Sequence, residues 1–178
     1  MVHETHGGET PHLVLGGARS GKSRFAEKLI TAYPPPYLYV ATAEILDEEM
    51  RLRVDHHRRR RGKAWETIEC PLNLVPLLNQ FNSQAVPVLV DCLTLWMSNL
   101  MLQETPCQPE LLVDSLSETL LRVNYPLVLV SNEVGCGIVP DNPFARRFRD
   151  LAGIANQKIA AACRRVTYVA AGLPLTLK

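Results

Sequence analysis

HLVLGGARSGKSRFAEKL, residues 12–29, is the stretch that decides the fold. Its first five residues form a short apolar run that ends in glycine, which is typical of a buried strand. The run from Gly16 to Ser23 matches the pattern G-x-x-x-x-G-K-[ST], and apolar residues at helical spacing follow it. A strand, a glycine-rich loop and a helix in this order predict a loop that binds phosphate groups.

The residue types in this loop each have a chemical reason. Its glycines allow backbone N–H groups to curve around phosphate oxygens, and the helix that follows adds a favourable dipole. Lys22 is expected to reach the β- and γ-phosphates, and the Ser23 hydroxyl to ligate Mg²⁺. The alternative is a glycine-rich turn that matches the pattern by chance. We expect nucleotide contacts from the whole loop: Gly16, Gly17, Ala18, Arg19, Ser20, Gly21, Lys22 and Ser23.

The rest of the chain alternates between strand and helix patterns. Short apolar or alternating runs predict strands at 12–16, 37–41, 65–70, 87–91 and 126–133. A strand, a Gly-Pro turn and a last strand are expected within 166–178. Helical spacing predicts helices at 22–33, 44–60, 72–81, 93–103, 109–123 and 143–165, the last with Asp141 or Asn142 as its cap. This alternation indicates a mostly parallel α/β sheet.

The totals fit one domain. A chain of 178 residues, 47% hydrophobic and 21% charged, is ordinary for a soluble globular protein, and we place that domain at 12–178 after a disordered N-terminal extension at 1–11. A membrane helix needs about 20 apolar residues in a row, and no apolar run in the chain approaches that length. The polar N-terminus lacks the apolar core of a signal peptide. The five cysteines form no C-x-x-C pair, which disfavours a zinc site or a disulfide framework. We therefore expect a cytoplasmic protein without a membrane span.

A phosphate loop usually works with a carboxylate at the end of a neighbouring strand, which holds the metal ion. Asp91 closes the run PVLVD, and Glu133 closes the run LVLVSNE. Each could instead be a helix cap or a turn acid, an interpretation that is weaker for Asp91. These parts predict a site for a nucleoside triphosphate and Mg²⁺, with Ser23 and Asp91 as metal ligands, and leave the acceptor open.

VDHHRRRRG, residues 54–62, concentrates positive charge in one place. From Arg51 to Lys63 there are seven basic residues and one acid, whereas the rest of the chain is net acidic. A nucleic-acid binder would more often spread its basic residues over a face, and only Trp65 is near enough for base stacking. A metal site is disfavoured because adjacent histidines rarely share one ion and no third ligand is evident. A solvated helix face stays open as an alternative.

Five blocks occur in an order that resembles one family closely. They are GGARSGKSRFAE (16–27), YVATAEILDEEM (39–50), HHR (56–58), VLVDCLT (88–94) and NEVGCGIVPDNPFARRFRDLAGIANQ (132–157). They resemble the bifunctional adenosylcobinamide kinase/adenosylcobinamide-phosphate guanylyltransferases of cobalamin biosynthesis, over about residues 13–178. The last block is the most specific, because a phosphate loop alone is generic. The chain departs from the family pattern in its N-terminal extension and at Asp91, where the family commonly has glutamate.

The resemblance implies both a fold and an activity. The fold would be a P-loop domain with a RecA-like, mostly parallel sheet. The enzyme would phosphorylate adenosylcobinamide with ATP or GTP, and would then transfer GMP from GTP onto adenosylcobinamide phosphate with release of pyrophosphate. The resemblance also implies a covalent guanylyl-histidine intermediate at the first histidine of the pair, His56, and a homotrimer.

Local chemistry agrees with a histidine nucleophile in this stretch. Neighbouring guanidinium groups disfavour a second positive charge, so they keep an imidazole neutral at pH 7. Arg58 and Arg59 can neutralise the triphosphate and the charge that develops on the α-phosphorus. On a helix His56 and His57 point about 100° apart, so they cannot serve one site equally. Periodicity does not choose between them, and we expect His57 to support the nucleotide site.

Two further groups are expected at the nucleotide. Ala41, Thr42 and Ala43 end the second strand, where α/β sheets bind ligands, although tight helix packing would explain the alanines equally well. Guanine recognition needs a carboxylate that faces the N1–H and the exocyclic amine. Glu69 and Asp91 are the candidates, and the residues alone do not decide between them.

Three functions are compatible with these observations. The first is the two-step enzyme, with ATP and GTP as substrates and no nucleic-acid partner. The second is a P-loop small-molecule kinase without nucleotidyl transfer. The third is a non-catalytic module that binds a nucleotide or a nucleic acid through the arginine run.

Overall fold

The computed structural model describes residues 10–43, 62–103 and 107–178. Within these ranges seven strands form one sheet in the order β3-β2-β4-β5-β1-β6-β7. The neighbours are parallel except for the antiparallel pair β6–β7. The strands are β1 (His12–Gly16), β2 (Tyr37–Ala41), β3 (Trp65–Glu69), β4 (Val88–Asp91), β5 (Leu127–Asn132), β6 (Arg165–Ala170) and β7 (Leu173–Thr176). The expected mostly parallel sheet with a C-terminal antiparallel hairpin is confirmed.

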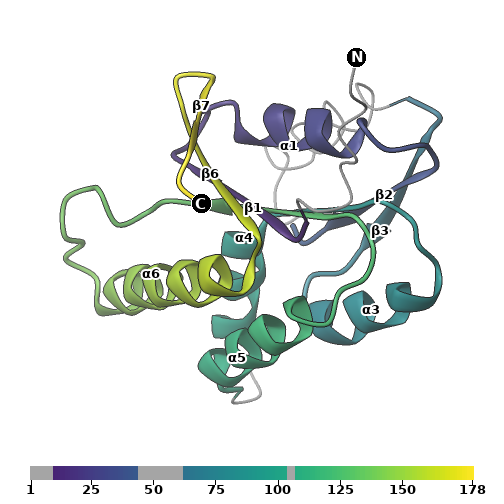
Figure 1. Ribbon diagram of the computed structural model, residues 1–178. Helices are drawn as coiled ribbons and strands as arrows, with labels where there is room; N and C mark the ends of the chain where they lie inside the picture. The colour runs from purple at the N-terminus through teal and green to yellow at the C-terminus, as the bar shows by residue number, and fades with distance from the viewer. Residues whose placement is uncertain (1–9, 44–61, 104–106) are drawn as a thin grey trace.

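The described helices cover the two faces of this sheet unequally (Figure 1). One face carries α1 (Lys22–Ile30), and the other carries α3 (Leu74–Gln80), α4 (Leu93–Met101), α5 (Pro109–Leu120) and α6 (Pro143–Ala162). A short 3-10 helix, Phe81–Ser83, extends α3. This is a layered α/β arrangement in which the sheet is buried between helices.

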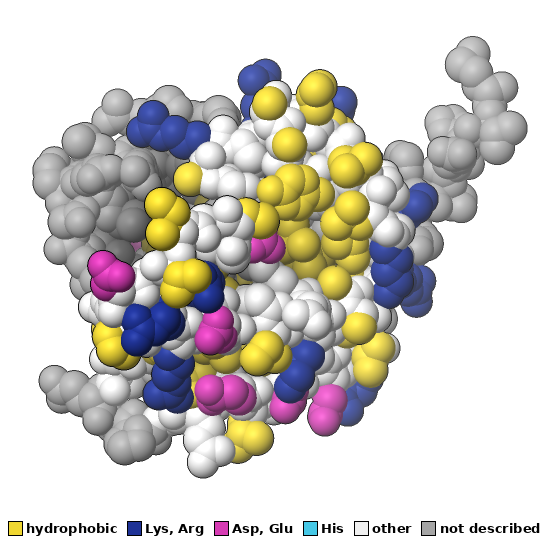
Figure 2. Space-filling model, turned by 90° about the vertical axis from the view of Figure 1, so that its left-hand side faces the viewer, with side chains coloured by type: hydrophobic (Ala, Val, Ile, Leu, Met, Phe, Trp, Pro, Cys, Tyr) yellow, Lys and Arg dark blue, Asp and Glu magenta, His cyan; other side chains and the backbone are white. Residues whose placement is uncertain are grey.

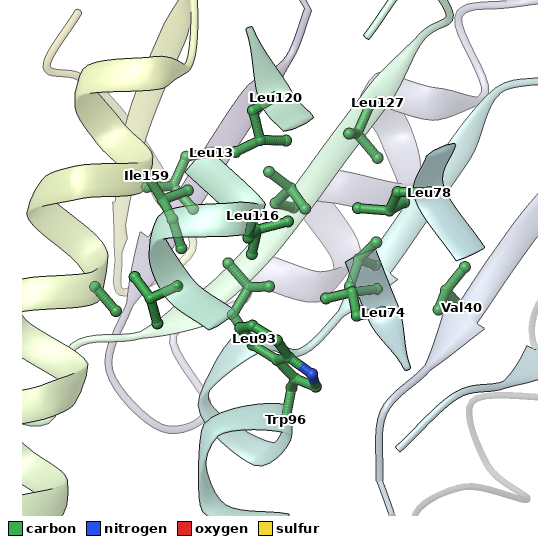
Figure 3. Packing of buried hydrophobic residues seen from close by; sticks show 14 of the residues in the cluster. Leu13, Val40, Leu74, Leu78, Leu93, Trp96, Leu116, Leu120, Leu127 and Ile159 are labelled. Carbon is green, nitrogen blue, oxygen red and sulfur yellow. The ribbon is translucent and has the colours of Figure 1, made fainter. Parts of the chain in front are cut away.

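Two apolar clusters hold the layers together. The larger lies between the sheet and α3 to α6 and surrounds Trp96, whose indole N–H donates to the Leu72 carbonyl at 2.8 Å (Figure 3). The smaller lies between the sheet and α1. Successive residues of a strand point to opposite faces, so Leu13 belongs to the large cluster and Val14 to the small one. Burial on both faces explains why the parallel strands are continuous apolar runs in the sequence.

The hairpin β6–β7 differs from its prediction. Its turn is formed by Ala171 and Gly172, both with positive φ, of 51° and 81°. The predicted turn residue Pro174 instead lies inside β7, opposite Val169. Proline is tolerated there because β7 is at the edge of the sheet and has no further strand to pair with.

Helix ends were also predicted with limited accuracy. The helices expected at 22–33 and 143–165 end at Ile30 and Ala162. The cap of α6 is Asn142, whose Oδ1 accepts from the Phe144 and Ala145 backbone N–H groups at 2.8 and 3.3 Å. The helix expected at 44–60 lies outside the described residues.

The described chain begins just before β1. Residues 1–9 of the expected N-terminal extension lie outside the description, whereas Pro11 is buried and its carbonyl accepts from the Arg164 N–H at 2.9 Å. In the described ranges no helix has both the length and the apolar content of a bilayer span.

Candidate active site at the carboxyl edge of the sheet

The carboxyl ends of β4, β5 and β1 meet at one edge of the sheet. Asp91 at the end of β4 pairs with Val130 of β5, and Gly16 at the end of β1 pairs with Asn132 of β5. The predicted phosphate loop and the predicted metal carboxylate therefore leave the sheet on the same side. Open parallel sheets bind their ligands at this edge.

The phosphate loop, residues 16–23, is held by backbone groups of the segments that follow β5 and β6, the two strands on either side of β1. The Glu133 N–H donates to the Gly16 carbonyl at 3.1 Å, and the Gly172 N–H donates to the Ser20 carbonyl at 2.8 Å. The second contact comes from the β6–β7 turn. The loop's shape is therefore set largely by main-chain groups that no side-chain pattern reveals.

Two glycines of the loop are required by close packing. A Cβ on Gly16 would lie 2.5 Å from the Val169 carbonyl oxygen and 2.6 Å from Ser20 Oγ. Gly21 has φ 95°, and a Cβ there would lie 3.2 Å from Gly172 Cα. Gly17 differs, because a Cβ on it would meet nothing within 4 Å. The loop is therefore tight against the sheet and open on the side of Gly17.

Lys22 lies folded back over the loop. Its side chain is only 8% exposed, and its Nζ donates to the Gly17 carbonyl at 3.0 Å. Burial lowers the pKa of Lys22, while the Asp91 carboxylate acts to raise it. An ammonium group already removed from water, with an acid nearby, is poised to exchange a protein carbonyl for a phosphate oxygen.

The two strand-end acids point to opposite faces of the sheet. Leu89 packs in the α1-side cluster, so Asp91, two residues later, shares the face of α1. Ser131 of β5 donates from Oγ to Asn156 Oδ1 of α6 at 2.8 Å, which places Glu133 on the α6 face. Asp91 is therefore the acid on the side of the phosphate-loop helix.

The donor set beside the loop suits a hard cation. Ser23 is half-buried in the first turn of α1, and Asp91 is half-buried with one carboxylate oxygen, Oδ2, accepting from the Tyr39 hydroxyl at 3.2 Å. Mg²⁺ is typically bound by one or two carboxylates together with substrate phosphates and waters. In the described ranges no group of three or more His, Cys, Asp or Glu residues gathers as it would for a metal held by the protein alone.

A buried polar network next to this site was not found by the sequence analysis. The Thr42 hydroxyl accepts from the Cys92 N–H at 2.8 Å and donates to the Cys92 carbonyl at 2.7 Å. Asn99 of α4 donates from Nδ2 to the carbonyls of Thr42 at 2.8 Å and Pro71 at 3.1 Å. Thr42, which is predicted to contact the nucleotide, is thus fully buried, and its hydroxyl is hydrogen-bonded to the Cys92 backbone. The signal for this network in the sequence is Asn99, a polar residue within the apolar run LTLWMSNLM.

Cys92 follows Asp91 but is not a nucleophile. Burial, with a smaller contribution from the Asp91 carboxylate, raises the pKa of its thiol to about 11. The thiol therefore stays protonated at neutral pH. All five cysteines of the chain are free.

The remaining predicted contacts lie along the same edge. Ala41 at the end of β2 pairs with Glu69 of β3 on one side and with Asp91 of β4 on the other. Glu69 is exposed and lines a cavity of about 460 Å³ between the end of β3 and α3. The structure thus places the two candidate guanine-binding acids on either side of Ala41, on strands that are separated by β2. His56, His57, Arg58 and Arg59 lie outside the described residues.

The protein therefore has a P-loop nucleotide-binding fold. Its defining features are a glycine-rich loop between a central strand and a helix, a buried lysine in that loop, and an aspartate at the end of a neighbouring strand. Solved structures agree with the fold. An ATPase from the type III secretion system of pathogenic bacteria has a TM-score of 0.55 at 10% identity, covering 93% of this chain and 56% of that one. A protein from Pyrococcus horikoshii OT3 has a TM-score of 0.51 at 11% identity, covering 96% and 86%.

Sequence comparison identifies the family. The profile of the cobinamide kinase / cobinamide phosphate guanyltransferase family matches residues 12–177, so the chain belongs to that family. The bifunctional adenosylcobalamin biosynthesis protein CobP of Pseudomonas aeruginosa is 45% identical over 166 residues, covering 93% of this chain and 96% of its own. CobU of Salmonella typhimurium, named as the same bifunctional protein, is 41% identical over 179 residues, covering 93% and 98%. The resemblance seen in the sequence is confirmed.

Proposed function

We propose that the protein carries out two successive reactions on adenosylcobinamide. In the first, the oxygen of the substrate's aminopropanol hydroxyl attacks the γ-phosphorus of ATP or GTP, the hydroxyl proton is released, and the nucleoside diphosphate leaves. In the second, a His56 nitrogen attacks the α-phosphorus of GTP and pyrophosphate leaves. A phosphate oxygen of adenosylcobinamide phosphate then displaces the histidine from that phosphorus, which gives adenosylcobinamide-GDP and regenerates His56.

The position of Lys22 is the observation that carries the kinase step. Its ammonium group is buried at the phosphate loop and interacts with the Asp91 carboxylate. In phosphoryl transfer the protein acts mainly by positioning the phosphates and by neutralising their charge. A buried cation does this more strongly than an exposed one, because less water screens it.

Ser23 and Asp91 are the residues that would hold Mg²⁺. Both supply oxygen atoms, and both lie on the α1 side of the sheet edge. When bound, Mg²⁺ would neutralise charge on the β- and γ-phosphates. The Tyr39 hydroxyl orients the Asp91 carboxylate through its hydrogen bond to Oδ2.

Guanine selectivity would come from a carboxylate at the ends of β3 and β4. Glu69 is the more accessible of the two acids, because it is exposed whereas Asp91 is half-buried. The family resemblance further supports a homotrimer, which a measurement of mass in solution would test.

The guanylyl-histidine step is tested by trapping the adduct. Incubation of the protein with GTP and Mg²⁺ should add the mass of one GMP, and peptide mapping should place it on the segment that contains His56. The bond should be a phosphoramidate, cleaved by acid and stable in base. His56→Asn should lose the adduct and the nucleotidyl transfer, yet still phosphorylate cobinamide, since that step depends on Lys22 and Ser23.

His57→Asn is the matched control, because it changes the adjacent residue in the same way. This variant should keep the adduct. Loss of the adduct in His57→Asn with retention in His56→Asn would reverse the assignment. If both variants keep the adduct, the pair only contributes charge near the triphosphate.

A further inference from the structure

We propose that the loop between β5 and α6, residues 133–142, binds the corrin ring of the cobinamide substrate through its apolar tip, Ile138 and Val139. We call it the β5–α6 loop. The inference rests on the proposed function in one respect: the acceptor hydroxyl has to reach the phosphate loop.

The loop begins where the phosphate loop begins. Asn132 at the end of β5 pairs with Gly16, and the next residue, Glu133, donates its N–H to the Gly16 carbonyl at 3.1 Å. From there the chain swings away from the sheet before it returns as α6 (Figure 1). A substrate whose hydroxyl lies at the phosphate loop must extend the rest of its bulk over the segments that leave the neighbouring strands. The β5–α6 loop is one of these segments.

The tip of the loop presents aliphatic side chains to solvent. Ile138 is 97% exposed and Val139 is 57% exposed. Aliphatic side chains gain free energy when a partner removes their surface from water. On the other side of β1, Leu173 follows the turn that contacts the phosphate loop and is also exposed. Figure 2 looks toward this side of the molecule and shows hydrophobic side chains exposed among charged ones.

Polar contacts hold the loop at both of its ends. At the start, Glu133 Oε1 accepts from the Gly135 N–H at 2.6 Å. At the end, Arg146 of α6 donates from Nη1 to the Pro140 and Asp141 carbonyls at 2.9 and 2.6 Å. These contacts place the tip without covering it. A preorganised apolar surface costs less to bind than one that has to be ordered first.

The chemistry of a corrinoid fits this surface. A corrin ring is a broad, flat macrocycle whose faces carry methyl groups and whose rim carries amides. Aliphatic side chains can contact the ring face, and the backbone of a glycine-containing loop can approach the amide rim closely. At Gly137 an added Cβ would meet nothing within 4 Å, so this part of the backbone is accessible.

The first test changes the tip and measures the substrate dependence of each step. The double variant Ile138→Ser, Val139→Ser should raise the KM for cobinamide by about tenfold for each side chain that loses its contact. The KM for ATP should stay the same, and so should guanylyl labelling from GTP in the absence of cobinamide. Leu121→Ser is the matched control, because Leu121 is 73% exposed and caps the C-terminus of α5, ahead of β5. It should leave all these values unchanged.

The second test uses Cys136, the exposed thiol of the loop, as a reporter in the unmodified protein. Saturating cobinamide should slow its alkylation by iodoacetamide several-fold, and GTP alone should not. Cys107, which is half-buried and donates from Sγ to the Leu100 carbonyl, serves as the internal comparison. Its alkylation rate should be the same with and without cobinamide.

Three results would overturn the proposal. The first is that cobinamide leaves the alkylation rate of Cys136 unchanged. The second is that the double variant retains the wild-type KM for cobinamide. The third is that Cys136 is unreactive without ligand and the double variant lowers the mass in solution, which would make the loop a subunit contact. Failure of the proposed function is distinguishable from all three. In that case the wild type shows neither phosphorylation nor labelling, while protection of Cys136 by cobinamide still reports binding to the loop.

Discussion

Two regions at the same edge of the sheet are built in opposite ways. The phosphate loop takes its shape from glycines and from backbone hydrogen bonds to Glu133 and Gly172. The junction of β2 and β4, made of Thr42, Cys92 and Asn99, is instead held by buried side-chain hydrogen bonds. The first arrangement leaves the side chains of the loop available to a ligand. The second uses its side chains to fix the backbone from which Asp91 projects.

The difference explains which parts of a nucleotide site can be seen in a sequence. A loop built on glycine spacing occupies eight consecutive residues and forms a motif. The junction joins residues that are 50 and 57 positions apart in the chain, so no local pattern contains it. The four changes below separate the chemical contribution of the loop from the structural contribution of the junction.

The largest effect is expected from Lys22→Ala. Loss of the buried ammonium should reduce phosphorylation of cobinamide by about 10³-fold or more, as removal of a cationic group from a transferring phosphoryl does. Because burial disfavours the charged form of Lys22, its removal should not lower the free energy of unfolding. Steady-state kinetics and urea unfolding measure the two quantities. Lys28→Ala, at the exposed last turn of α1, is the control. Normal phosphorylation by Lys22→Ala would show that the loop is not the kinase site.

Asn99→Ala should be the most damaging change to stability. It leaves the buried Thr42 carbonyl and the partly buried Pro71 carbonyl without their amide donor, at a cost of about 2–4 kcal/mol in the free energy of unfolding. Gln103→Ala removes an exposed amide that contacts the same helix and should cost less than about 0.5 kcal/mol. Urea unfolding compares the two. Equal values would mean that the junction contributes no more than the surface does.

Gly16→Ala tests the packing of the loop against the sheet. The added Cβ would meet the Val169 carbonyl at 2.5 Å, so the backbone must shift, which we expect to cost about 1–3 kcal/mol. Gly17→Ala adds the same atom in open space and should change stability by less than about 1 kcal/mol. Thermal unfolding of both variants decides the matter. A Gly16→Ala protein as stable as wild type would show that the loop adjusts freely.

Tyr39→Phe should have the smallest effect. It removes the hydroxyl that donates to Asp91 Oδ2 and should cost about 0.5–1.5 kcal/mol in stability. Tyr37→Phe, in the same strand, removes a hydroxyl that donates to the Tyr33 carbonyl and should cost a similar amount. Only Tyr39→Phe should also raise the Mg²⁺ concentration needed for half-maximal phosphorylation, by about two- to tenfold. A shift of equal size in Tyr37→Phe would remove Tyr39 from the metal site.

Local patterns were sufficient for the phosphate loop, the parallel strands and the type of each described helix. They were insufficient where pairing decides the outcome. Pro174 looked like a turn residue, but β7 is an edge strand and accepts it. The hydrogen bonds between the Thr42 hydroxyl and the Cys92 backbone could not be predicted, because only the pairing of β2 with β4 brings these two residues near each other. Asp91 and Glu133 looked alike as strand-end acids until the strands' register assigned them to opposite faces.

The central position of β1 also has a consequence for synthesis on the ribosome. Its two partner strands, β5 and β6, come much later in the chain, and His12 of β1 is hydrogen-bonded to Thr167 of β6, 155 positions away. At roughly 5–20 residues per second, that distance takes roughly 8–30 s to translate. During this time β1 is an apolar strand without its neighbours, which is the kind of segment that chaperones bind. The nascent chain therefore gains a closed phosphate loop, and with it stabilisation by nucleotide, only after β5 and the β6–β7 turn have been synthesised.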